Sequence, residues 1–188
     1  MKLTARDITL AAMFAALAAV AAALFRFGAP VVPFSLVPFV ALLAGMILGG
    51  RLGAVSMAVY LLMGLLGLPV FEKPPFGGPA YVLQPTFGFL LGFVLSAYVT
   101  GKVLGEKSSP GLARYLLASL AGLTALYLVG LPYLYAILNF YLGKSVPVIK
   151  VIQIGLLPFI AFDLIKAVLS SLLARAVVRR VRSAVITE

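Results

Sequence analysis

Apolar residues occupy long uninterrupted stretches of this chain, and short stretches rich in Gly, Pro and charged residues separate them. Runs of about 15–20 apolar residues favour membrane-spanning helices, whereas a membrane β-barrel would show strict alternation of apolar and polar positions. The pattern predicts six helices, over residues 5–25, 36–48, 52–68, 86–104, 112 onward and 158–179. A brief half-helix is predicted over residues 146–154. The expected fold is an all-α polytopic membrane protein with six transmembrane helices.

The composition agrees with this fold class and excludes several kinds of chemistry. The 188 residues are 63% hydrophobic and 11% charged, with a mean hydropathy of +1.17, whereas a soluble domain has about 25% charged residues. We expect residues 1–188 to form a single membrane-embedded substrate-binding domain. Because Cys and His are both absent, disulfides, thiol catalysis and Cys/His metal sites are excluded. No metal or cofactor is expected. The sequence shows no nucleophile–base pair, so the protein is not expected to be an enzyme.

The net charge of +10 is typical of some nucleic-acid-binding proteins. Here the basic residues lie at the ends of apolar stretches, where they orient helices in a membrane, so no nucleic-acid partner is expected. With six crossings, ten Lys and Arg residues lie on one side, four lie on the other, and Lys166 lies inside the last helix. The positive-inside rule then places both termini in the cytoplasm. The loop over residues 69–84 and the start of the last helix face the outside.

One acid and one base interrupt the last apolar stretch. Asp163 and Lys166 are three residues apart, so they share a face of the helix that starts at Pro158. Charged residues inside a membrane are costly and usually face a cavity or a partner. The pair anchors a ligand, or it is a structural ion pair that neutralises itself. As anchors, the Asp would accept hydrogen bonds from N–H groups and the Lys would neutralise a carboxylate.

Other polar residues could complete such a site. The irregular stretch over residues 69–84 contains Tyr81 and ends at Gln84, and it covers a pocket or serves as a plain connector. Asn139 lies further along the chain, where it lines the pocket or is solvated at the membrane interface. We expect Tyr81, Gln84 and Asn139 to add polar contacts to a ligand held by Asp163 and Lys166.

Small residues recur along the first predicted helix. Ala11, Ala15 and Ala19 are spaced four residues apart, which creates a flat stripe that another helix can approach closely. Spacing alone leaves two alternatives open, a docking face for a partner membrane protein and close packing inside the bundle.

Four segments resemble the BioY family, the biotin-binding S components of energy-coupling factor (ECF) transporters. They are residues 40–54 (VALLAGMILGGRLGA), 60–71 (YLLMGLLGLPVF), 85–93 (PTFGFLLGF) and 157–167 (LPFIAFDLIKA). The segments follow the family's order over nearly the whole chain. The chain departs from the family's usual glycine-rich stretch at Glu72-Lys73-Pro74-Pro75.

The resemblance implies a six-helix protein in the plasma membrane of a prokaryote that binds biotin at its extracellular side. It also implies a membrane coupling (T) protein and two cytoplasmic ATPases as partners. Asp163 and Lys166 match the family's binding acid and base, and Ala11, Ala15 and Ala19 are similar to its small-residue docking face. The alternative is a stand-alone secondary transporter of biotin or a related small carboxylic acid, in which Asp163 would carry a proton.

Overall fold

The computed structural model describes residues 4–28, 35–105 and 110–186, and side chains at 25, 27, 28 and 181–186 are outside this description. All regular elements in the described residues are helical. The sequence also predicts a loop with Pro30 and Pro33 and a turn at Ser108-Ser109-Pro110-Gly111, of which Pro30, Pro33, Ser108 and Ser109 lie outside the described residues.

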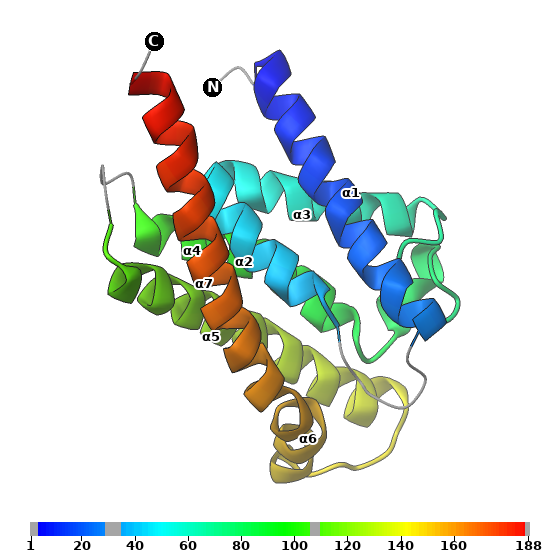
Figure 1. Ribbon diagram of the computed structural model, residues 1–188. Coiled ribbons are helices and arrows are strands. Elements are labelled where there is room, and N and C mark those ends of the chain that lie inside the picture. Colours follow the sequence, from blue (N-terminus) through cyan, green and yellow to red (C-terminus); the bar gives the residue numbers. More distant parts are fainter. Residues whose placement is uncertain (1–3, 29–34, 106–109, 187–188) are drawn as a thin grey trace.

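The helices form one bundle (Figure 1). Their bounds are α1 Ala5–Gly28, α2 Val37–Leu48, α3 Gly50–Leu65, the 3-10 helix η1 Pro79–Leu83, α4 Phe87–Leu104, α5 Leu112–Ala136, the π-helical turn η2 Ile137–Tyr141, α6 Val148–Gly155 and α7 Leu157–Ile186. The beginning of α1 and the end of α7 lie at the same end of the molecule, and α6 lies at the other end (Figure 1).

Four of these helices are long and apolar enough to cross a membrane. They include the spans Ala5–Leu24, Phe87–Leu104, Leu112–Tyr141 and Leu157–Arg180. The 12 residues of α2 and 16 residues of α3 extend about 18 and 24 Å, less than the roughly 30 Å of a bilayer core. The six predicted apolar segments therefore all fold as helices, and four of them have the length of a full crossing.

The short helix α2 lies at the centre of the bundle. It packs against α1, α3, α4, α5 and α7, and nine of its residues, from Val37 to Met46, are buried. Pro38 lies at the start of the helix, where its missing N–H leaves no helical hydrogen bond unmade. Protein therefore shields α2 from lipid, which removes the need for a helix of full membrane length.

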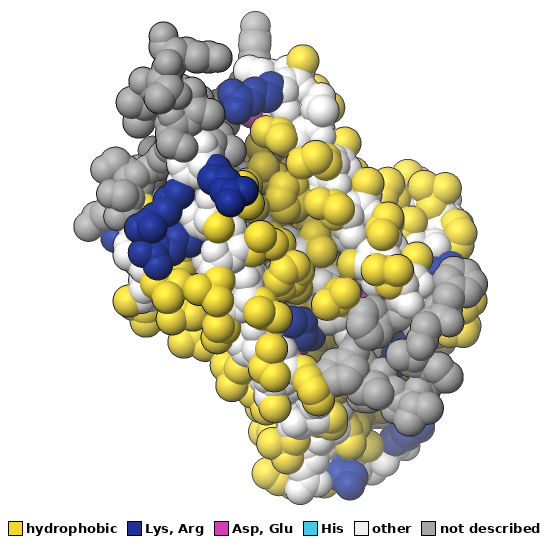
Figure 2. Space-filling view, in the orientation of Figure 1, with side chains coloured by type: hydrophobic (Ala, Val, Ile, Leu, Met, Phe, Trp, Pro, Cys, Tyr) yellow, Lys and Arg dark blue, Asp and Glu magenta, His cyan; other side chains and the backbone are white. Residues whose placement is uncertain are grey.

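Close helix contacts depend on residues without side chains. A Cβ atom at Gly101 of α4 would overlap the backbone of Gly50 at the start of α3. The outward surfaces of the long helices are instead covered by large apolar side chains, such as Leu128, which is 69% exposed. Figure 2 shows hydrophobic side chains over most of one face, with Lys and Arg side chains gathered near the end of α7. This surface is typical of a protein surrounded by lipid.

Candidate ligand-binding site

The charged pair of α7 faces the interior of the bundle. Asp163 and Lys166 are 3% and 7% exposed, whereas Ile165 between them is 55% exposed. The Lys166 ammonium forms an ion pair with Asp163 Oδ1, as the three-residue spacing on a helix allows. The pair is therefore buried in the protein and separated from lipid by the opposite face of α7.

Two further contacts hold the pair in place. Lys166 Nζ donates a hydrogen bond to the Ser35 carbonyl oxygen over 2.8 Å, and the Tyr127 hydroxyl of α5 donates to Asp163 Oδ2. Both carboxylate oxygens of Asp163 thus have a partner, which offsets part of the cost of burying the charges. The arrangement connects α7 to α5 and to the segment just before α2.

A cavity of about 660 Å³ lies beside this pair. Its walls are largely apolar, and its polar lining gathers at Asp163, Lys166 and the loop between α3 and α4. The apolar lining includes Val37, Phe89, Leu90, Phe93, Leu126, Leu134 and Phe159, and the polar lining includes Arg26, Ser35, Tyr60, Glu72, Lys73, Tyr81, Thr86, Tyr127, Asp163 and Lys166. We call it the central cavity. Its volume and its few converging polar groups are typical of a small-molecule site.

The 66–86 loop, which joins α3 to α4, covers part of the central cavity. Within the loop, the Phe71 N–H donates to the Phe76 carbonyl over 2.8 Å, and the Gly78 N–H attaches the loop to α3 by donating to the Gly64 carbonyl over 2.7 Å. Phe71 is fully buried between the rings of Tyr60 and Tyr81, at centroid distances of 5.7 and 4.4 Å. The aromatic contacts anchor the loop to α3 and η1.

Arg26, in the last turn of α1, also binds the 66–86 loop. Its Nη2 donates to the carbonyl oxygens of Pro69, over 2.7 Å, and Phe71. The guanidinium also lies 4.1 Å from the centroid of the Phe76 ring, a favourable cation–π distance. The loop is therefore attached to α1 through one side chain.

The structure brings Asp163, Lys166 and Tyr81 together around the central cavity, and it places Gln84 and Asn139 elsewhere. Gln84 Nε2 donates to the Pro74 carbonyl over 3.4 Å. Asn139 Nδ2 donates to the carbonyls of Tyr135 and Val146, over 3.0 and 3.1 Å. Both side-chain amides thus donate hydrogen bonds to backbone carbonyls, as most hydrogen-bonded side chains do in proteins.

The alanines of the first helix lie on its inner face. Ala11 and Ala15 are 4% and 1% exposed and Ala19 is half-buried, on a helix that packs against α2 and α3. The outward face of α1 carries other small residues, Ala12 and Ala16, which are exposed. Close packing inside the bundle thus accounts for the burial of Ala11 and Ala15.

Several cavity residues were absent from the sequence-based prediction. Tyr127 and Ser35 reach Asp163 and Lys166 from distant parts of the chain, and nothing in their local sequence marks them. Glu72 could have been singled out from the sequence, because it is one of only five acids in a chain of 188 residues. Burial raises the pKa of Glu72 to about 7, although hydrogen bonding with Ser35 and the charges of Lys166 and Lys73 oppose the shift.

Comparison with known proteins agrees with this architecture. A sequence model of the BioY family matches residues 1–183. The probable biotin transporter BioY of Lysinibacillus sphaericus is 42% identical over 95% of this chain and 89% of its own length. The biotin transporter BioY of Thermotoga maritima is 40% identical over 76% of this chain and 79% of its own. These relatives are named as transporters, not enzymes.

A solved structure has the same fold. The crystal structure at 2.1 Å of the S-component for biotin from an ECF-type ABC transporter aligns with a TM-score of 0.70 at 23% identity. The alignment covers 92% of this chain and 90% of that one. The family model matches nearly the whole sequence, and a relative is 42% identical over 95% of the chain. These matches show that the chain belongs to the BioY family.

Proposed function

We propose that this protein is the biotin-binding membrane subunit, or S component, of an ECF-type uptake transporter. The observation that carries the proposal is the buried Asp163–Lys166 pair beside a cavity of about 660 Å³. Biotin combines a polar ureido ring, an apolar ring with a hydrocarbon chain, and a carboxylate. A largely apolar cavity with a carboxylate and an ammonium at one wall is complementary to such a molecule. The names of the relatives support the same ligand.

The proposed contacts follow from the residues that line the central cavity. Asp163 accepts a hydrogen bond from a ureido N–H, Lys166 donates to a polar group of biotin, and Tyr81 forms part of the wall. Gln84 and Asn139 do not line the cavity, and their amide nitrogens bind backbone carbonyls, so they are not among the proposed ligand contacts.

We place the protein in the prokaryotic plasma membrane with six crossings and both termini in the cytoplasm. The distribution of basic residues supports this orientation, and so does the position of the beginning of α1 and the end of α7 at one end of the bundle (Figure 1). The central cavity then opens toward the extracellular side, because it lies by the end of α1 and the beginning of α7. The whole chain acts as one membrane-embedded binding unit.

The sequence has no ATP-binding motif, so uptake against a gradient needs either ion coupling or a separate ATPase. The proposed partners are a membrane coupling protein and two cytoplasmic ATPases. The outward face of α1, with Ala12 and Ala16, offers a close approach for a partner helix beside the buried Ala11 and Ala15. Ala19 lies between the two faces, being half-buried.

A stand-alone transporter with Asp163 as proton carrier fits the geometry less well. Asp163 is already paired with Lys166, and protonating it would leave a buried ammonium uncompensated. Co-purification of native complexes separates the two functions, because only a subunit brings down a coupling protein and ATPases.

Calorimetric titration of the detergent-purified protein with biotin tests the proposal. The expected result is saturable one-to-one binding that Asp163→Asn abolishes while the variant stays folded. Tyr141→Phe, which changes an exposed residue that does not line the cavity, is the control. Absence of binding by the folded wild-type protein would overturn the proposed function.

A further inference from the structure

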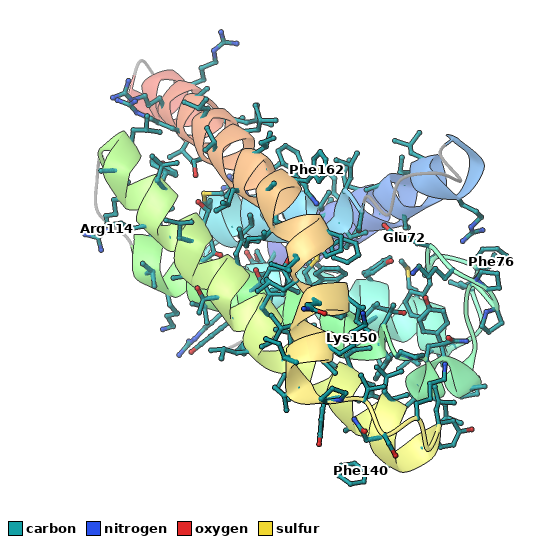
Figure 3. The ribbon with its side chains drawn as sticks, turned by 90° about the horizontal axis from the view of Figure 1, so that it is seen from below. Glu72, Phe76, Arg114, Phe140, Lys150 and Phe162 are labelled. Atoms are coloured by element: carbon teal, nitrogen blue, oxygen red, sulfur yellow. The ribbon has the colours of Figure 1, made fainter. Side chains whose placement is uncertain are left out.

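Glu72 is the only acid in the 66–86 loop, and it lines the central cavity. Its Oε1 atom is buried from solvent and has no hydrogen-bond partner among the residues that the structure describes. Figure 3 shows Glu72 within the outline of the helices, whereas Phe76 of the same loop lies at the edge of the molecule. A buried carboxyl oxygen without a protein partner is costly, so such an atom in a cavity wall is available to a donor on a bound ligand.

Charged and titratable groups surround Glu72 from several elements. Burial has the largest effect on its pKa, and the nearby cations and the Ser35 side chain act against burial. Near neutral pH the carboxyl is therefore divided between its protonated and ionised forms. The groups that face it are Arg26 of α1, Ser35, Tyr60 of α3, Lys73 of the loop, Tyr81 of η1, and Lys166 with its partner Asp163 of α7.

The chemistry of a cyclic urea fits this arrangement. A cyclic urea presents one carbonyl acceptor between two N–H donors. The cavity lining offers the Lys166 ammonium beside Asp163, further cations at Arg26 and Lys73, and two carboxyls, Asp163 and Glu72. Both oxygens of Asp163 already accept a bond within the protein, whereas Oε1 of Glu72 has no partner among the described residues. A carboxylate oxygen can accept a second bond, so Asp163 can still match one N–H of the urea, and the second N–H needs another acceptor.

We propose that Glu72 is a ligand-binding residue of this site and that its Oε1 accepts a hydrogen bond from a ureido N–H of bound biotin. This inference rests on the proposed function and adds an acceptor supplied by the loop to the pair on α7. Ligand binding would then join the 66–86 loop to α7 through one ring of the ligand.

The proposal makes biotin binding depend on pH in a defined direction. An N–H donor binds the ionised carboxylate more strongly than the protonated carboxyl, so binding releases a proton from Glu72. Affinity therefore rises with pH through about 7, by about tenfold between pH 6 and 8 when the bound state requires the ionised form. The chain contains no histidine, so no His side chain contributes to a change in this range.

Calorimetric titration with biotin at pH 6, 7 and 8 tests the inference, with each pH measured in two buffers of different ionisation enthalpy. The wild-type protein is expected to release a proton and to bind more tightly at pH 8. Glu72→Gln should bind with the same affinity at all three pH values and release no proton. Glu72→Met, which removes the acceptor, should bind at least about tenfold more weakly at pH 8. Lys144→Gln, at an exposed position that does not line the cavity, is the control, since it leaves Glu72 and its neighbours in place and should keep the pH dependence.

Biotin methylated at one or the other ureido nitrogen tests the contact itself. For one of the two compounds, methylation should cost much less affinity in Glu72→Met than in the wild-type protein, because the variant has no bond to lose. The assignment would be overturned if, for both compounds, methylation cost Glu72→Met as much affinity as it costs the wild-type protein. A wild-type affinity that falls with rising pH would overturn it as well. Pronounced biotin binding that is unchanged in Glu72→Gln and Glu72→Met refutes only the role of Glu72. Failure of the wild-type protein to bind biotin at any pH refutes the proposed function.

Discussion

Lys166 Nζ donates a hydrogen bond to the carbonyl oxygen of Ser35 over 2.8 Å, across 131 positions of sequence. The contact joins the inner face of α7 to the residue that precedes α2. Because the same ammonium is paired with Asp163, it satisfies a backbone carbonyl and a carboxylate at once. The wall of the central cavity is thus held by a side chain that itself lines the cavity.

Lys166→Met should weaken biotin binding by about 2–5 kcal/mol, because it leaves the carboxylate of Asp163 buried without a cation. Calorimetric titration measures the change, and Lys150→Met, on the exposed surface of α6, is the matched control. Adding Asp163→Asn to Lys166→Met should restore thermal stability but not binding. Wild-type affinity in Lys166→Met would contradict the role assigned to this ammonium.

Arg26→Met should loosen the 66–86 loop, because it removes the hydrogen bonds to the Pro69 and Phe71 carbonyls and the contact with the Phe76 ring. Hydrogen exchange of the amides over residues 69–78 should become about tenfold faster or more, as expected for losing bonds from a charged donor. Mass spectrometry of the folded protein measures the exchange. Arg6→Met, at the exposed start of the same helix, should leave the exchange rates unchanged. Equal exchange rates in the two variants would contradict the role of Arg26 in holding the loop.

The two faces of α1 should respond differently to a larger side chain. Ala15→Leu inserts volume at a position that is 1% exposed, so it should lower the free energy of unfolding by about 1–3 kcal/mol. Ala16→Leu, on the exposed face, should leave stability and biotin binding unchanged but abolish biotin uptake by cells. Full uptake by Ala16→Leu would argue against docking on this face.

The stability of the ligand-free protein should fall as the pH rises from about 5 to about 7.5. The pKa of Glu72 is raised to about 7 in the folded protein from 4.5, so the folded state binds more protons than the unfolded state between these values. Thermal unfolding measured across this pH range tests the effect. Glu72→Gln should remove the part of the pH dependence of the unfolding temperature that comes from Glu72. A wild-type unfolding temperature that rises over the same interval would contradict the buried position of the carboxyl.

The helices and the charged pair were predictable from the sequence because each depends on local pattern. Apolar runs fix the helices, and the three-residue spacing of Asp163 and Lys166 fixes their shared face. The contacts made by Tyr127 and Ser35 depend on which helices meet, and no local pattern encodes that. Spacing also left the orientation of Ala11 and Ala15 open, because a small residue suits both an inner face and a docking face. Tertiary packing decides between them.

The link from Arg26 to the loop has a mechanical consequence. Arg26 lies in the last turn of α1 and is bound to the loop at Pro69, Phe71 and Phe76. The loop therefore cannot lift from the cavity without breaking these contacts or pulling on the end of α1. A helix transmits such a pull along its axis, here over 24 residues, or about 36 Å. The cover of the central cavity and the far end of α1 are thus mechanically coupled through the length of one helix.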